Sequence, residues 1–108
     1  MKIERNIKNI IQKVFTRKGL ILYSIFLFGS RARGDFREES DFDILIITED
    51  ELPQKERRNL AGEILTALHE EIKSISFDVL VKSRKNFEEE KDIVNTISNE
   101  VFLEGTKL

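Results

Sequence analysis

The sequence has no cysteine and no tryptophan, and it contains only one proline and one histidine. The lack of cysteine excludes disulfide bonds and thiolate metal sites. The longest mainly apolar run, 20–28, is much shorter than the roughly 20 residues that a membrane-spanning helix needs. Charged residues interrupt the N-terminus at Lys2, Glu4 and Arg5, too early for a secretory signal. We therefore expect a cytoplasmic protein with no membrane contact.

Neither sign of charge dominates the chain. There are 18 basic and 20 acidic residues, which gives a formal net charge of −2. A strongly basic footprint is typical of general nucleic-acid binders, so direct nucleic-acid binding is not expected. A length of 108 residues with 40% hydrophobic residues is enough to close a modest core. We predict a single domain spanning 1–108.

The apolar residues fall into blocks whose spacing predicts alternating helices and strands. Apolar residues at helical spacing predict helices over 2–18, 53–73 and 87 to about 101. Runs of β-branched and aromatic residues predict strands over 20–28, 42–48 and 76–81. This alternation predicts a sheet covered by helices. The segment 102–108 fits a frayed end, an added strand or a contact surface equally well.

A loop of unusual composition follows the first predicted strand, with the sequence Phe28-Gly29-Ser30-Arg31-Ala32-Arg33-Gly34. Glycine lets the backbone turn sharply and lets a ligand approach the main chain, and Ser30 is a good helix cap. A helix that starts after a strand presents backbone N–H groups that suit phosphate oxygens. Arg31 and Arg33 either assist phosphates or are ordinary solvated loop residues. Taken alone, the loop fits a simple capped turn equally well.

Two carboxylates stand at the start of the second predicted strand. Residues two apart in a strand face the same side, so Asp41 and Asp43 should project together and Phe42 should point away. Adjacent carboxylates repel each other, and Mg²⁺, which prefers hard oxygen ligands, would offset that repulsion. Asp78 is the one charge in the apolar stretch 75–81. If its strand pairs with the second one, three carboxylates can serve metal-assisted phosphoryl chemistry.

An ordinary structural explanation exists for each aspartate taken singly. Asp41 would cap a turn, Asp43 would sit at an exposed strand end, and Asp78 would pair with a lysine. The combination of an Asp-x-Asp pair, a third aspartate within a strand and a phosphate-type loop favours the metal site instead.

Gly29-Ser30, ten further residues and then Asp41-Phe42-Asp43 resemble the Gly-Ser-x10-Asp-x-Asp signature of the polymerase-β-like nucleotidyltransferases. The flanking residues look like those of the minimal nucleotidyltransferases, the MNT family. The resemblance implies an α+β nucleotidyltransferase fold, a small mixed sheet with helices packed on it. It also implies that nucleotide is bound by Gly29, Ser30 and Arg33. Metal binding and catalysis would fall to the carboxylates of Asp41, Asp43 and Asp78, with Asp78 as the general base or base-side ligand.

The same resemblance implies a function. Many proteins that this chain resembles act as antitoxins of a HEPN-type toxin. In that family, AMP is transferred from ATP, with Mg²⁺, to a tyrosine hydroxyl of the toxin. The resemblance therefore implies a hetero-oligomer. Larger relatives carry a further domain that binds the acceptor, whereas only about 25 residues follow the strand of Asp78. The acceptor site is therefore expected to come from another subunit or protein. Two alternatives stay open: a non-catalytic antitoxin that occludes the toxin, and the catalytic subunit of a small-molecule nucleotidyltransferase.

Overall fold

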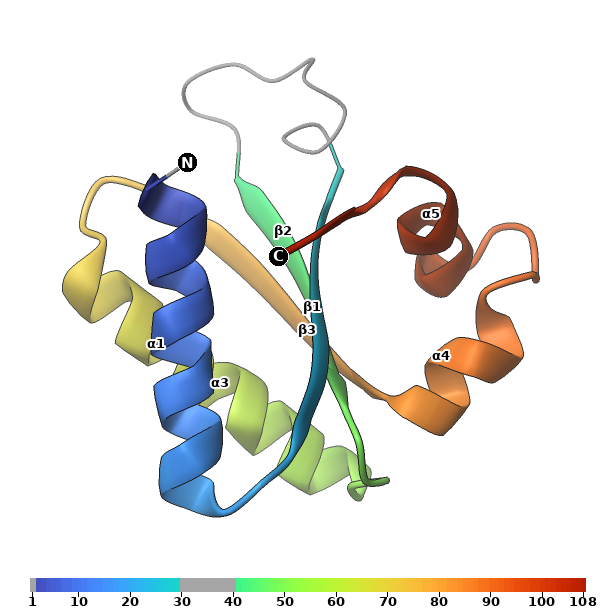
Figure 1. Cartoon of the computed structure of the whole chain (residues 1–108), viewed down its shortest axis with the longest axis horizontal. Helices are drawn as coiled ribbons and strands as arrows, with labels where there is room; N and C mark the ends of the chain where they lie inside the picture. Colours follow the sequence, from blue (N-terminus) through green and yellow to red (C-terminus); the bar gives the residue numbers. More distant parts are fainter. Residues whose placement is uncertain (1, 30–40) are drawn as a thin grey trace.

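A computed structural model describes residues 2–29 and 41–108 of the chain. The described helices and strands alternate in the manner that the sequence predicts, and the α+β fold class is confirmed (Figure 1). The helices are α1 (Lys2–Lys18), α3 (Gln54–Glu71), α4 (Arg84–Glu90) and α5 (Ile97–Glu104), and the strands are β1 (Leu22–Phe28), β2 (Phe42–Thr48), β3 (Phe77–Ser83) and β4 (Thr106–Lys107).

The strands form one mixed sheet in the order β3-β2-β1-β4. β1 pairs antiparallel with both β2 and β4, whereas β2 pairs parallel with β3. Two parallel neighbours need a crossover connection, and α3 provides it. β2 therefore lies between β3 and β1, which explains why it is apolar at nearly every position.

One face of the sheet is covered by α1 and α3 (Figure 1). Apolar residues recur along both helices at helical spacing, so each presents a continuous stripe to the sheet. The cluster on this face contains the buried residues Ile7, Ile10, Ile11, Val14, Phe15, Ile25, Leu27, Phe42, Ile44, Ile46, Leu60, Ile64, Leu68, Phe77 and Val79. This face holds most of the buried apolar side chains that the structure describes.

The opposite face carries a second, smaller cluster under α4 and α5. Its buried members are Phe28, Leu45, Ile47, Phe87 and Val101. The rings of Phe26 and Phe87 stack with centroids 5.8 Å apart, so α4 is fixed to β1 by an aromatic pair. The two short helices therefore cover this face of the sheet only in part.

The first helix ends at Lys18, as predicted, and Gly19 follows it. This residue has φ +70°, and the N–H groups of Gly19 and Leu20 donate to the carbonyls of Thr16 at 3.2 Å and Phe15 at 3.0 Å. These are the two hydrogen bonds of a Schellman cap.

The prediction of one helix from 87 to about 101 is wrong, because two short helices occupy this part of the chain. Asn95 adopts φ 72° and breaks the helical path. Thr96 then caps α5, since its Oγ1 accepts a hydrogen bond from the N–H of Asn99 at 3.0 Å. α4 is capped in the same way, with Ser83 Oγ accepting from the N–H of Asn86. The local caps therefore determine where these helices begin, in place of the apolar periodicity.

The C-terminal segment contributes to both a helix and the sheet. α5 continues to Glu104, and β4 then pairs with Phe26 and Leu27 of β1. The N–H of Leu108 donates to the carbonyl of Ile25 at 2.9 Å. Of the three possibilities for 102–108, the added strand is the one that the structure bears out for its last residues.

Among the helices of residues 2–29 and 41–108, none combines the length and the apolar character needed to cross a membrane.

Candidate active site

Gly29 follows directly on the last residue of β1. Its φ is +74°, a conformation that side chains with a Cβ rarely adopt. A Cβ at this position would overlap Asp43 Oδ2 and would lie 3.2 Å from Asp43 Cγ. Glycine is therefore required for two independent reasons, the backbone turn and the close approach of a carboxylate.

The two strands that carry Asp43 and Asp78 bring these residues side by side. In the parallel register of β2 and β3, Asp43 is the partner of Asp78. In the antiparallel register of β1 and β2, Asp43 is also the partner of Phe28, the residue before Gly29. Neighbouring strands lie about 4.8 Å apart. Three consecutive strands thus place Gly29, Asp43 and Asp78 in one row across the sheet.

Both aspartates lie on the sheet face that α4 and α5 partly cover. Along β2, Phe42 belongs to the cluster under α1 and α3, whereas Leu45 belongs to the opposite cluster. Alternation along the strand puts Asp43 on the side of Leu45, and the same argument puts Asp78 on the side of Leu80 in β3. The predicted orientation of Phe42, away from Asp43, is confirmed.

The three aspartates differ in exposure. Asp43 is half-buried, and Asp78 is exposed. Asp41 precedes β2 by one residue and is exposed as well. Ser30, Arg31 and Arg33 lie outside the described residues.

The described residues therefore provide part of the predicted site. Across 2–29 and 41–108, no three His, Cys, Asp or Glu side chains are grouped closely enough to hold a metal ion. What the structure does bring together is the pair Asp43 and Asp78 beside Gly29. Carboxylate oxygens are the ligands that Mg²⁺ prefers, commonly one or two of them completed by phosphates and waters. The donor set fits a magnesium ion that is shared with a nucleotide.

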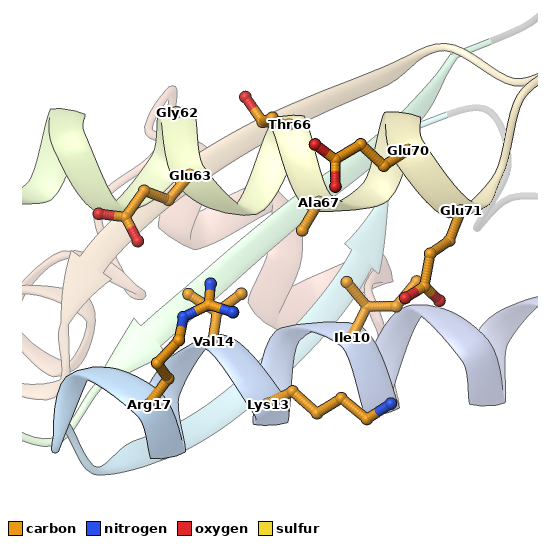
Figure 2. A pocket seen from close by; sticks show the side chains of 10 residues that line it. All are labelled: Ile10, Lys13, Val14, Arg17, Gly62, Glu63, Thr66, Ala67, Glu70 and Glu71. Carbon is orange, nitrogen blue, oxygen red and sulfur yellow. The ribbon is translucent and has the colours of Figure 1, made fainter.

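A separate groove of about 570 Å³ runs between α1 and α3. Figure 2 shows Arg17 of α1 pointing toward Glu63 of α3 across it. The groove lies among the helices of the covered face, and none of the predicted site residues lines it. It is therefore distinct from the carboxylate row.

Comparison with known proteins decides what this arrangement belongs to. The family model described as "Nucleotidyltransferase domain" matches residues 7–102. The chain belongs to this family. The match includes Gly29, Asp41, Asp43 and Asp78. The resemblance of the motif to nucleotidyltransferases is therefore confirmed at the level of the family.

One curated relative of this nucleotidyltransferase domain matches less than half of the chain. The chain is 45% identical over 47 residues to "Putative protein adenylyltransferase MJ0604" of Methanocaldococcus jannaschii, and the matched part is 44% of this chain and 47% of that protein. The match thus spans about half the length of the curated relative.

Two solved structures share the fold of this nucleotidyltransferase domain. One is a toxin–antitoxin with AMP-PNP, at TM-score 0.58 and 24% identity, covering 92% of this chain and 69% of that chain. The other is a tri-AMPylated Shewanella oneidensis HEPN toxin in complex with MNT antitoxin, at TM-score 0.56 and 21% identity, covering 95% of this chain and 69% of that chain. At these identities, the likeness establishes the fold.

Proposed function

We propose that this chain is a magnesium-dependent nucleotidyltransferase that transfers AMP from ATP to a tyrosine hydroxyl of a partner HEPN-type toxin, and that it acts as the antitoxin of that toxin. The observation that carries the proposal is the row formed by Gly29, Asp43 and Asp78 across three consecutive strands. Paired carboxylates beside a tight glycine turn suit a nucleotide whose phosphates share a divalent cation.

The comparisons support the acceptor and the donor in this proposal. The curated relative is named a protein adenylyltransferase. Among the solved structures that share the fold, one is a toxin–antitoxin with AMP-PNP, and another pairs an MNT antitoxin with an AMPylated HEPN toxin. ATP as the donor and a toxin as the acceptor are therefore the choices that fit the relatives best.

Each site residue has a defined task in the proposed reaction. Gly29 and Ser30 hold the triphosphate at the end of β1, and Arg33 adds positive charge beside it. Asp41 and Asp43 hold Mg²⁺. When bound, this ion screens the charge that develops on the pyrophosphate leaving group. Asp43 can hold this ion next to the phosphate-binding turn, because Gly29 has no Cβ between its backbone and that carboxylate.

Asp78 takes the proton of the acceptor. The hydroxyl oxygen forms a bond to the α-phosphorus of ATP, the bond from that phosphorus to the pyrophosphate oxygen breaks, and the hydroxyl proton passes to Asp78. The exposed position of Asp78 suits this task, since the acceptor arrives from another protein. Asp43, which is half-buried, suits the nucleotide side of the site.

The proposal can be tested by intact mass. The purified chain is incubated with ATP, Mg²⁺ and the product of the neighbouring gene. We expect AMP to be added to a tyrosine of the partner. The double variant Asp41→Asn with Asp43→Asn should slow this transfer about a hundredfold or more. Asp50→Asn is the matched control, because Asp50 is an exposed aspartate in the loop after β2.

Other results would replace the proposal with one of two alternatives. A tight complex that neutralises the toxin without ATP and leaves its mass unchanged would make the chain an occluding antitoxin. Transfer of AMP to a small soluble acceptor, with no protein partner present, would make it the catalytic subunit of a small-molecule nucleotidyltransferase.

A further inference from the structure

Large apolar side chains are exposed on α5 and on the turn that precedes it. The exposed fractions are 54% for Ile93, 73% for Val94, 40% for Ile97, 51% for Phe102 and 69% for Leu103. We call these five residues the α5 patch. They contrast with Ser98 and Val101 of the same helix, which are buried. Val101 packs in the cluster that joins α5 to the sheet. Val94, Ile97 and Leu103 of this patch line one hollow, and apolar side chains exposed together in this way typically mark an interaction surface.

Hydrogen bonds hold the turn before α5 in a defined shape. Thr96 Oγ1 lies 2.8 Å from the carbonyl of Ile93 and 3.1 Å from that of Glu90. Asn99 Nδ2 donates to the carbonyl of Lys91 at 2.7 Å. Ser98 Oγ donates to Glu90 Oε1 at 3.1 Å. The α5 patch is therefore presented by a built turn, so little conformational entropy would be lost when a partner binds.

The charge around the α5 patch is mainly negative. Val94, Ile97 and Leu103 line a hollow of about 460 Å³ to which Glu100 and Glu104 also contribute. The cation beside the patch is already engaged, because Lys91 Nζ lies 2.8 Å from Glu88 and 5.1 Å from the centre of the Phe102 ring. A matching partner would present apolar side chains together with lysine or arginine.

The patch lies on the same side of the sheet as the candidate site. Val101 of α5 belongs to the buried cluster that contains Phe28, and Phe28 is the register partner of Asp43. Figure 1 shows α5 beside the end of β1 that leads to Gly29. A protein bound to the patch would therefore lie over the face that carries Asp43 and Asp78.

We propose that the α5 patch docks the protein that carries the acceptor hydroxyl, through an apolar surface that includes basic residues. This inference rests on the proposed function, in which the acceptor belongs to another protein. The charge argues for such a partner over a second copy of this chain. A symmetric contact between two copies would bring Glu100 of one copy near Glu100 of the other, and like charges at an interface are unfavourable.

The test measures affinity and transfer separately, again with the product of the neighbouring gene as the probe. Leu103→Lys places a like charge opposite the expected basic partner and removes apolar contact. We expect it to raise Kd about tenfold or more, while the rate of AMP transfer at saturating partner stays near that of the unmodified chain. Ile21→Lys is the matched control, because Ile21 is 60% exposed and precedes β1. It should leave Kd unchanged.

Two further variants complete the test. Glu100→Lys should weaken binding and reduce its dependence on salt concentration, because it removes a favourable long-range attraction. Asp43→Asn should bind the partner as tightly as the unmodified chain and transfer no AMP. Circular dichroism of each variant verifies that exposed substitutions leave the fold intact.

The outcomes distinguish the docking inference from the proposed function. If Leu103→Lys binds and modifies the partner as the unmodified chain does, the α5 patch is not the docking site and the proposed function stands. If the chain alone is a dimer that Leu103→Lys converts to a monomer, the patch contacts a second copy and the inference is wrong. If the unmodified chain neither binds nor modifies the partner, the proposed function fails and the inference fails with it.

Discussion

The two faces of the sheet differ in how completely they are covered. On one face, α1 and α3, of 17 and 18 residues, bury a large apolar cluster. On the other, α4 and α5, of 7 and 8 residues, cover a smaller cluster and carry exposed apolar side chains of their own. The carboxylates lie on this second face. The covered face supplies the stability, which allows the other face to carry groups that do not favour folding.

The central strand β2 contains this contrast within a few residues. Ile44 and Ile46 are fully buried against the helices of the covered face. Asp43, on the other side of the same strand, is aligned with a second carboxylate, Asp78. Carboxylates placed side by side repel each other. The arrangement persists because the apolar half of the strand is well packed.

The first way to sharpen the comparison is to remove the charge of Asp78. We expect Asp78→Asn to slow AMP transfer about a hundredfold or more, because the acceptor hydroxyl loses its proton acceptor. The free energy of unfolding should not fall, since the change removes repulsion from Asp43. Single-turnover transfer and urea unfolding measure the two effects. A loss of stability that matches the loss of activity would show that Asp78 is structural.

A second comparison concerns the apolar residues of the two faces. Ile46→Ala should lower the free energy of unfolding by about 3 kcal/mol, because it leaves a cavity in the covered face. Leu80→Ala, on the carboxylate face, should cost about 1 kcal/mol, since Leu80 is only partly buried. Equal losses in urea unfolding would mean that the two faces contribute alike.

Two glycines with positive φ provide a matched pair. Gly19 has φ +70° and would have nothing within 4 Å of an added Cβ, whereas at Gly29 the Cβ would overlap Asp43. Gly19→Ala should cost about 1 kcal/mol from the backbone alone. Gly29→Ala should cost about 1 kcal/mol more because of the overlap, and it should also reduce AMP transfer.

The source of that extra cost can be isolated in a second background. When Asp43 is replaced by alanine, the overlapping carboxylate is gone. The difference between the Gly29→Ala and Gly19→Ala costs should then disappear, as in a double-mutant cycle. A difference that persists would place the strain in the backbone near Gly29.

The smallest expected effect is a dependence of stability on pH. Lys82 Nζ donates to Glu90 Oε1 at 2.9 Å, and this hydrogen bond lowers the pKa of Glu90 below its ordinary value of 4.5. A lowered pKa stabilises the folded state above the pKa of the unfolded chain, and the contribution is lost as pH falls through the folded value. The pair is partly exposed, so its contribution is about 1 kcal/mol at most.

Lys82→Met tests this link between β3 and α4. The difference in unfolding free energy between pH 7 and pH 3 should shrink relative to the unmodified chain. Lys85→Met is the control, because Lys85 is 66% exposed and lies 4.0 Å from Glu51. The prediction fails if both variants change the pH dependence by the same amount.

Much of the fold follows from local sequence patterns. The predicted bounds of the helix 2–18 and the strand 42–48 agree with the structure, because the apolar period is unambiguous there. The break between α4 and α5 could not be predicted in the same way. The apolar spacing over 87–101 is helical, but Asn95 and Thr96 offer a turn and a cap that compete with helical hydrogen bonds.

The sequence names candidate site residues, whereas their geometry depends on the fold. Spacing predicts a common side for Asp41 and Asp43, and the structure places Asp43 within β2 and Asp41 just before it. The alignment of Asp43 with Asp78 depends on the register of two strands separated by α3, which local patterns do not determine. The contact of Gly29 with the Asp43 carboxylate likewise arises only when β1 and β2 pair.

The parallel pairing of β2 and β3 has a consequence for dividing the chain. α3 ends before the exposed residues Lys73 and Ser74, and exposed turns of this kind tolerate cleavage best. A cut there would leave Gly29 and Asp43 on one fragment and Asp78 on the other. Neither fragment could carry the reaction alone, so the catalytic rate would rise with fragment concentration and would report directly on the reassembly of the sheet.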